Sequence, residues 1–127
     1  MARDTGIRDA ILIIVDHANN FIPSKYKNLG LPKYITESHI AYDLNILNLS
    51  KRINILLESD IVYGEHSRLV IDLNRGQNDP TLIPSISDKK LIPGNIGISS
   101  REFNFRNIKN KFWYFCRFRP SSYSKML

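Results

Sequence analysis

The sequence contains a single cysteine, Cys116, among its 127 residues. One thiol can form neither an internal disulfide nor a cysteine cage, so a metal site would have to use His, Asp, Glu or Asn. Long apolar runs are also absent. The longest covers residues 10–15 (AILIIV), far short of the roughly 20 residues that span a membrane. No small-residue cleavage site follows it, which argues against a signal peptide. We therefore expect a cytoplasmic protein with no membrane partner.

Acidic residues are scarce at the C-terminal end, and this explains the formal net charge of +6. Residues 1–100 hold 11 basic and 11 acidic side chains and are neutral, whereas residues 101–127 hold 7 basic residues and only Glu102. A dedicated nucleic-acid binder usually spreads basic charge over the folded face that docks on phosphate. We therefore expect no DNA partner, and we divide the chain into an α/β domain at 1–106 and a divergent basic, aromatic tail at 107–127.

The apolar pattern predicts an α/β fold. Residues 10–15 form an unbroken Ile/Val/Leu run, typical of a strand buried on both faces in a parallel sheet. Residues 60–63 and, more strongly, 69–73 predict two further strands. Apolar spacing predicts one amphipathic helix over 37–58, with Thr36 as a capping residue, and a second helix from about 101 capped by Ser99 or Ser100. Residues 76–98, rich in Gly and Pro, predict a long functional loop. This order favours a three-layer sandwich around a mostly parallel sheet, incomplete as it stands.

Asp16 and His17 lie where the first predicted strand ends, a position from which strands commonly present functional residues. An imidazole and an amide oxygen three residues later, at Asn20, can coordinate Zn²⁺ from one side if another part of the chain supplies a third ligand. Asp16 could then fix the tautomer of the imidazole. The alternative is a hydrogen-bonded histidine that caps the strand end. Both interpretations are left open by the residues alone.

The segment SRLVIDLNR, residues 67–75, places Arg68 and Arg75 at the two ends of a predicted buried strand, with Asn74 beside the second. An arginine fork matches a carboxylate in bidentate fashion, and a neighbouring amide adds a hydrogen bond. The segment therefore predicts a site for an acidic substrate. A structural salt bridge between Asp72 and Arg75 is an equal alternative.

Three more residues are candidates. His39 and Asp43 are four apart on the predicted helix and would share a face, as a ligand pair, as a base with its orienting residue, or as a plain surface pair. His66 precedes Arg68 and is a reserve candidate for metal binding or proton transfer. We take Arg68 and Asp43 as the catalytic candidates, and His17, Asn20 and His66 as the metal candidates.

With these motifs in view, the sequence resembles the N-formylglutamate amidohydrolase family over about residues 10 to 106. The resemblance rests on short blocks in the family's order: DHANNFIP (16–23), LGLP (29–32), HIAYD (39–43), SRLVIDLNR (67–75), DPTLIP (79–84), SD (87–88) and IPGN (92–95). Together the blocks are far more specific than any one of them.

The resemblance implies a fold similar to that of zinc carboxypeptidases and aspartoacylases. It makes His17 the first zinc ligand, Asn74 and Arg75 the clamp for the substrate carboxylate, and Arg68 a carbonyl polariser or second clamp. The implied reaction is zinc-assisted hydrolysis of N-formyl-L-glutamate, or a related N-acyl amino acid, to formate and glutamate in histidine breakdown. Members of the family are about twice as long, so we expect a truncated or split product whose activity is impaired unless a second chain supplies the missing half.

Two other classes of function are alternatives to an amidohydrolase. Basic and aromatic residues interleave after residue 105, as in modules that contact single-stranded nucleic acid or a membrane surface; the members are Arg106, Lys109, Lys111, Phe112, Trp113, Tyr114, Phe115, Arg117, Phe118 and Arg119. The third possibility is an inactive structural remnant.

Overall fold

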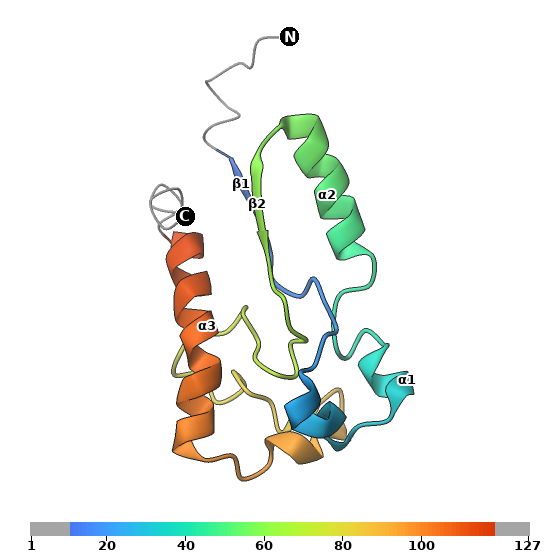
Figure 1. Ribbon diagram of the computed structural model, residues 1–127, viewed down its shortest axis with the longest axis vertical. Helices are drawn as coiled ribbons and strands as arrows, with labels where there is room; N and C mark the ends of the chain where they lie inside the picture. Colours follow the sequence, from blue (N-terminus) through green and yellow to red (C-terminus); the bar gives the residue numbers. More distant parts are fainter. Residues whose placement is uncertain (1–10, 119–127) are drawn as a thin grey trace.

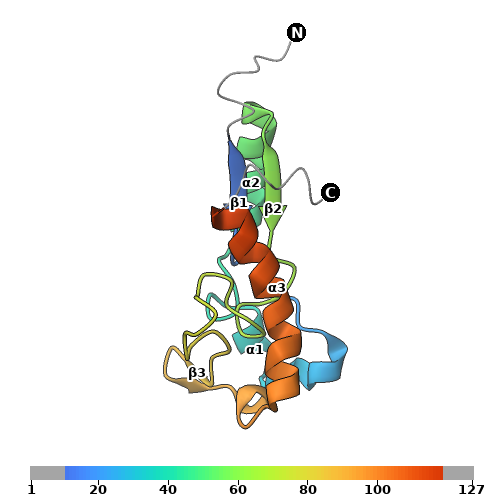
Figure 2. The ribbon, with the colours of Figure 1, turned by 90° about the vertical axis from the view of Figure 1, so that its left-hand side faces the viewer.

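The computed structural model describes residues 11–118. A parallel two-stranded sheet and its connecting helix lie at one end of the molecule, and a loop-rich body lies at the other (Figure 1). A long C-terminal helix runs along the body and reaches the end of the sheet (Figure 2). The chain is thus an α/β structure with a parallel sheet, as the sequence predicts.

The sheet pairs β1 (Leu12–Val15) with β2 (Asp60–Tyr63) in parallel, with Leu12 opposite Asp60 and Val15 opposite Tyr63. Parallel neighbours need a crossover connection, usually helical. Here the crossover contains α2 (Ile46–Leu57), which packs on the sheet. Both strands agree with the predicted ranges 10–15 and 60–63.

The prediction of one helix over 37–58 is wrong in its first part, because α2 begins at Ile46. Asn45 has φ 63°, a left-handed conformation that ends the preceding turn. The backbone N–H of Asp43 donates to the carbonyl of His17 at 2.9 Å. This bond holds residues just before the helix against the end of β1, so the apolar spacing of residues 40–44 serves a packed turn. The predicted cap, Thr36, instead closes the short helix α1 (Lys33–Thr36).

The predicted strand at 69–73 is also wrong. The backbone N–H groups of Val70 and Ile71 both donate to the carbonyl of Ser67, and that of Asp72 donates to Leu82. Leu69, Val70 and Ile71 are almost completely buried. A short apolar run is compatible with any buried segment, and this one forms a compact turn at the centre of the body.

The predicted loop at 76–98 contains two very short strands, β3 (Ile86–Ser87) and β4 (Lys90–Leu91), paired antiparallel, and the 3₁₀ turn η3 (Pro93–Asn95). η3 packs against an earlier 3₁₀ segment, η2 (Ser24–Gly30). Contact is close: a Cβ on Gly94 would lie 2.6 Å from the Cα of Leu29. The main hydrophobic cluster gathers around this junction and includes Leu29, Leu69, Val70 and Ile92.

The last helix, α3, covers Ser100–Phe118. The hydroxyl of Ser99 accepts a hydrogen bond from the N–H of Glu102, which confirms one of the two predicted caps. The division at 106/107 lies inside this helix. Arg106 and Trp113 are each 4 % exposed, so neither presents its side chain on a surface for nucleic acid. The described helices include none that is long and apolar enough to cross a membrane.

Candidate functional site

His17 lies two residues past the end of β1 and has a carboxylate at each ring nitrogen. Nε2 is 2.6 Å from Oδ1 of Asp72, and Nδ1 is 3.5 Å from Oδ2 of Asp43. The imidazole is largely buried, with 12 % of its side chain exposed. The partner at Nε2 is therefore Asp72, whereas Asp16, the predicted partner, accepts a hydrogen bond from the indole N–H of Trp113.

Asp72 is buried, and it carries negative charge at the centre of the site. Burial by itself raises the pKa of this carboxyl group. The hydrogen bond to His17, the backbone N–H of Asn74 at 2.9 Å and the electrostatic interactions with His17 and Arg75 outweigh burial and hold the pKa below its ordinary value. Nε of Arg75 is 3.6 Å from Oδ2 of Asp72. The salt bridge that the sequence offered as an alternative thus exists, together with the contact to His17.

Arg68 connects the second carboxylate to the backbone. Its guanidinium forms an ion pair with Asp43 and donates a hydrogen bond of 3.0 Å to the carbonyl of His39. Asp43 is half-exposed, whereas Arg68 is mostly covered. His39 and Asp43 do not share a helix face as predicted, because the helix begins later, but Arg68 bridges the carbonyl of one and the carboxylate of the other.

A cleft of about 260 Å³ opens next to these residues. Its lining combines two arginines with carboxylate, hydroxyl and apolar groups: Arg68, Asp72, Arg75, Thr81, Pro84, Ile86, Ser87 and Asp88. The guanidinium of Arg75 is half-exposed. The geometry offers a small pocket in which positive charge can meet an anionic group.

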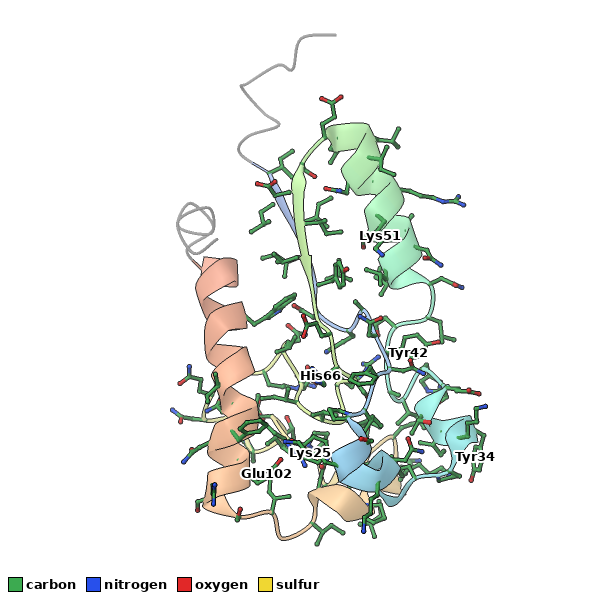
Figure 3. All side chains as sticks on the ribbon, viewed as in Figure 1. Lys25, Tyr34, Tyr42, Lys51, His66 and Glu102 are labelled. Carbon is green, nitrogen blue, oxygen red and sulfur yellow. The ribbon has the colours of Figure 1, made fainter. Side chains whose placement is uncertain are left out.

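The remaining predicted site residues lie at the edge of this group. The amide of Asn20 donates to the carbonyl of Thr36 at 2.9 Å. His66, labelled in Figure 3, has its ring centre 5.6 Å from that of Phe21. It lines a separate cavity of about 230 Å³. Asn74 is exposed and contributes its backbone N–H to Asp72. The structure thus brings together His17, Asp43, Arg68, Asp72 and Arg75.

Two buried residues that the sequence did not assign to the site hold the central turn in place. Arg106 donates to the carbonyl of Val70 at 3.1 Å, to Oδ1 of Asn95 at 2.8 Å and to Glu102 at 3.0 Å. Asn95 donates to the carbonyl of Leu69 at 2.7 Å. Both therefore fix the backbone between Arg68 and Asp72. The only signal in the sequence was that Asn95 lies in the IPGN block.

Two donors at the site suit a zinc ion. Two ligands of a tetrahedral zinc, each about 2.0–2.2 Å from the metal, lie roughly 3.3–3.5 Å apart. Nδ1 of His17 and Oδ2 of Asp43 have this separation, 3.5 Å. Asp72, on the other ring nitrogen, suits the carboxylate that commonly orients a zinc-bound histidine. Among residues 11–118, no group of three or more His, Cys, Asp or Glu side chains is arranged to hold a metal.

Comparison with known proteins supports the resemblance seen in the sequence. Residues 9–108 match the model of the N-formylglutamate amidohydrolase family. A solved structure, described as the gene product Atu2144 from Agrobacterium tumefaciens, is similar with a TM-score of 0.72 and 33 % sequence identity. The match covers 78 % of this chain and 39 % of the other. No curated protein matches the sequence. The family match spans most of the sequence, and the chain therefore belongs to the N-formylglutamate amidohydrolase family.

Proposed function

We propose that this chain forms the zinc-binding and substrate-binding part of an amidohydrolase that removes the formyl group from N-formyl-L-glutamate or a related N-acyl amino acid. The observation that carries the proposal is the arrangement around His17, which has Asp72 at one ring nitrogen and Asp43 at the other. Family membership supports the reaction class. The proposal includes a three-layer fold similar to that of zinc carboxypeptidases and aspartoacylases.

In this proposal His17 and Asp43 hold the metal. Asp72 accepts a hydrogen bond from the N–H at Nε2, which fixes the tautomer and leaves the lone pair of Nδ1 to bind the metal. Bound zinc supplies a Lewis acid for the amide carbonyl and lowers the pKa of a bound water. Asn20 and His66 remain candidates for additional ligands, although the amide of Asn20 also bonds the end of α1.

The cleft supports an acidic substrate. Arg75 is half-exposed at its wall and Asn74 adjoins it, so a substrate carboxylate can receive a guanidinium fork and an amide hydrogen bond. Arg68 also lines the cleft and pairs with Asp43, and in this proposal it polarises the carbonyl of the scissile amide. Because Arg68 also neutralises Asp43, its loss would leave that carboxylate without its guanidinium partner.

A binding experiment tests this assignment. Isothermal titration of N-formyl-L-glutamate into the zinc-loaded chain should show binding that weakens at least tenfold in Arg75→Ala. Arg101→Ala, a change at an exposed arginine on α3, should leave the affinity unchanged. Equal affinity in Arg75→Ala and the parent chain would show that the carboxylate clamp is elsewhere.

A further inference from the structure

Helix α3 continues past the stretch that matches the family, and its last turns pack against the fold near the candidate site. The family match ends at residue 108, whereas α3 runs to Phe118. Two side chains of these turns are buried: Asn110 is 1 % exposed and Trp113 is 4 % exposed. Figure 2 shows this part of α3 rising from the body to the end of the strands. The segment that the sequence set apart as a tail therefore contributes to the structure around the site.

Trp113 bonds the residue that precedes the proposed metal ligand. Its indole N–H donates to Oδ1 of Asp16, and His17 follows directly in the sequence. An indole N–H can only donate, and when it is buried it usually has an acceptor. The bond joins residues 97 apart, so it ties the end of α3 to the end of β1.

Packing does not enclose the indole on every side. Trp113 lines the cavity of about 230 Å³ together with Gly64, Ile71 and Leu73 among others. A ring that borders such a space has room to turn, because neighbouring atoms are absent on that side. The hydrogen bond to Asp16 is a directional contact that holds the ring in one orientation, and it holds the side chain of Asp16 in return.

The backbone around His17 is held from two further directions. The N–H of Gly64 donates to the carbonyl of Val15 at 2.9 Å. The N–H of Asp43 donates to the carbonyl of His17, also at 2.9 Å. These bonds fix the peptide groups on either side of Asp16. Helix α3 adds a restraint on the side chain that lies between them.

We propose that Trp113 is a positioning residue that acts on His17 through Asp16. Consecutive side chains project from one backbone, so a fixed Asp16 limits the rotation of that backbone and with it the direction of the imidazole. The ring nitrogens lie 3.5 Å from Asp43 and 2.6 Å from Asp72, and a rotation would lengthen one or both contacts. The effect of Trp113 on zinc rests on the proposed function, whereas its effect on the place of His17 is independent of the metal.

Hydrogen exchange of the zinc-free full chain tests this role, because the amide of Asp43 reports the place of His17. Trp113→Phe keeps an aromatic ring but has no donor. Exchange at Asp43 should become about threefold to tenfold faster, the effect of losing one hydrogen bond. The amide of Ile92, which is hydrogen-bonded within the loop-rich body, should keep its rate. Phe105→Leu, at an exposed aromatic on the same helix, is the matched control and should leave both rates unchanged.

Substitutions at Asp16 show whether Trp113 acts through this residue. Asp16→Asn keeps an oxygen that can accept the indole N–H and should exchange like the parent chain. Asp16→Ala should exchange as fast as Trp113→Phe, and combining the two should change nothing further. Because Asp16→Ala removes the bond from its other end, it decides the question even if Trp113→Phe does not fold.

Zinc affinity, measured against a competing chelator, tests the consequence for the metal. Trp113→Phe should weaken zinc binding by about threefold to tenfold, less than the roughly 10- to 100-fold typical of a group bonded to the ligand itself. Equal affinity in Trp113→Phe and the parent chain would overturn the effect on the metal. If the parent chain binds no zinc, the proposed zinc site is wrong, and exchange at Asp43 still decides whether Trp113 positions His17.

Two exchange results would overturn the positioning role. One is an unchanged rate at Asp43 in both Trp113→Phe and Asp16→Ala. The other is an equal acceleration at Asp43 and Ile92, because it would show that the bond contributes only to the general stability of the fold.

Discussion

Nε2 of His17 lies 2.6 Å from Oδ1 of Asp72, and this contact joins two segments 55 residues apart in the sequence. The same carboxylate accepts the backbone N–H of Asn74 and lies near Arg75. One buried aspartate thus connects the proposed metal ligand to the proposed carboxylate clamp. Removal of this carboxylate should therefore weaken both metal binding and substrate binding.

We expect Asp72→Asn to reduce zinc affinity by about 10–100-fold, because carboxylates that orient a metal-bound histidine typically contribute this much. Asparagine occupies the same space but has only one oxygen that can accept a hydrogen bond, and its NH2 group can only donate. Zinc titration followed by a competing chelator measures the change. Asp79→Asn, at a carboxylate that bonds Thr81, is the control, and an equal affinity in Asp72→Asn would contradict the orienting role.

Asp72 should also make the stability of the fold depend on pH. Its pKa in the folded chain is held below the value in the unfolded chain, about 3.9. Its contribution is therefore fully present above pH of about 4 to 5 and is lost as the pH falls through the lower, folded-state pKa. Urea unfolding at several pH values gives the free energy of unfolding of the parent chain and of Asp72→Asn. The difference between the two free energies should be constant near neutrality and become smaller in acid. A difference that becomes larger in acid would contradict a lowered pKa of Asp72 in the folded chain.

Arg106→Met should lower the free energy of unfolding by about 2–4 kcal/mol, since it leaves buried acceptors at Val70 and Asn95 without their donor. Arg106 also stacks on Tyr26, with its guanidinium carbon 4.3 Å from the ring centre. Denaturant unfolding followed by circular dichroism measures the loss. The exposed Arg101→Met should change stability by less than about 0.5 kcal/mol, and a similar effect in both variants would show that the network contributes nothing specific.

Gly64→Ala should destabilise the chain by about 1–3 kcal/mol or more. A Cβ at this position would lie 2.5 Å from the carbonyl oxygen of Asp16 and 2.9 Å from Leu73, so the backbone beside His17 would have to move. A Cβ on Gly76 meets nothing within 4 Å. Thermal unfolding should therefore separate Gly64→Ala from Gly76→Ala, and an equal melting temperature for the two would contradict the close approach.

The parts of the fold that depend on local pattern could be predicted from the sequence. The apolar runs at 10–15 and 60–63 gave β1 and β2, and the Ser99 cap marked the start of α3. The segment 69–73 could not be assigned correctly, because a buried turn and a buried strand have the same apolar composition. The start of α2 was misplaced since the bond from Asp43 to His17 is non-local.

The candidate site shows the same division. Each of His17, Asp43, Arg68 and Arg75 could be selected by residue type and position. Of their contacts, only the salt bridge between Asp72 and Arg75 was offered, as an alternative. The choice of Asp72 over Asp16 as the partner of His17 depends on a turn that brings residue 72 back to the end of β1. The alternative hypothesis grouped Arg106 with residues that contact nucleic acid or a membrane surface, whereas its guanidinium is buried and donates to Val70 and Asn95.

The most direct test of the central claim is the metal content of the purified chain after zinc loading and dialysis, measured by mass spectrometry for the parent chain and His17→Ala. We expect one zinc per chain in the parent and almost none in His17→Ala, with a folded circular dichroism spectrum in both. Equal zinc content in the two chains, or none in the parent, would contradict a zinc site built on His17.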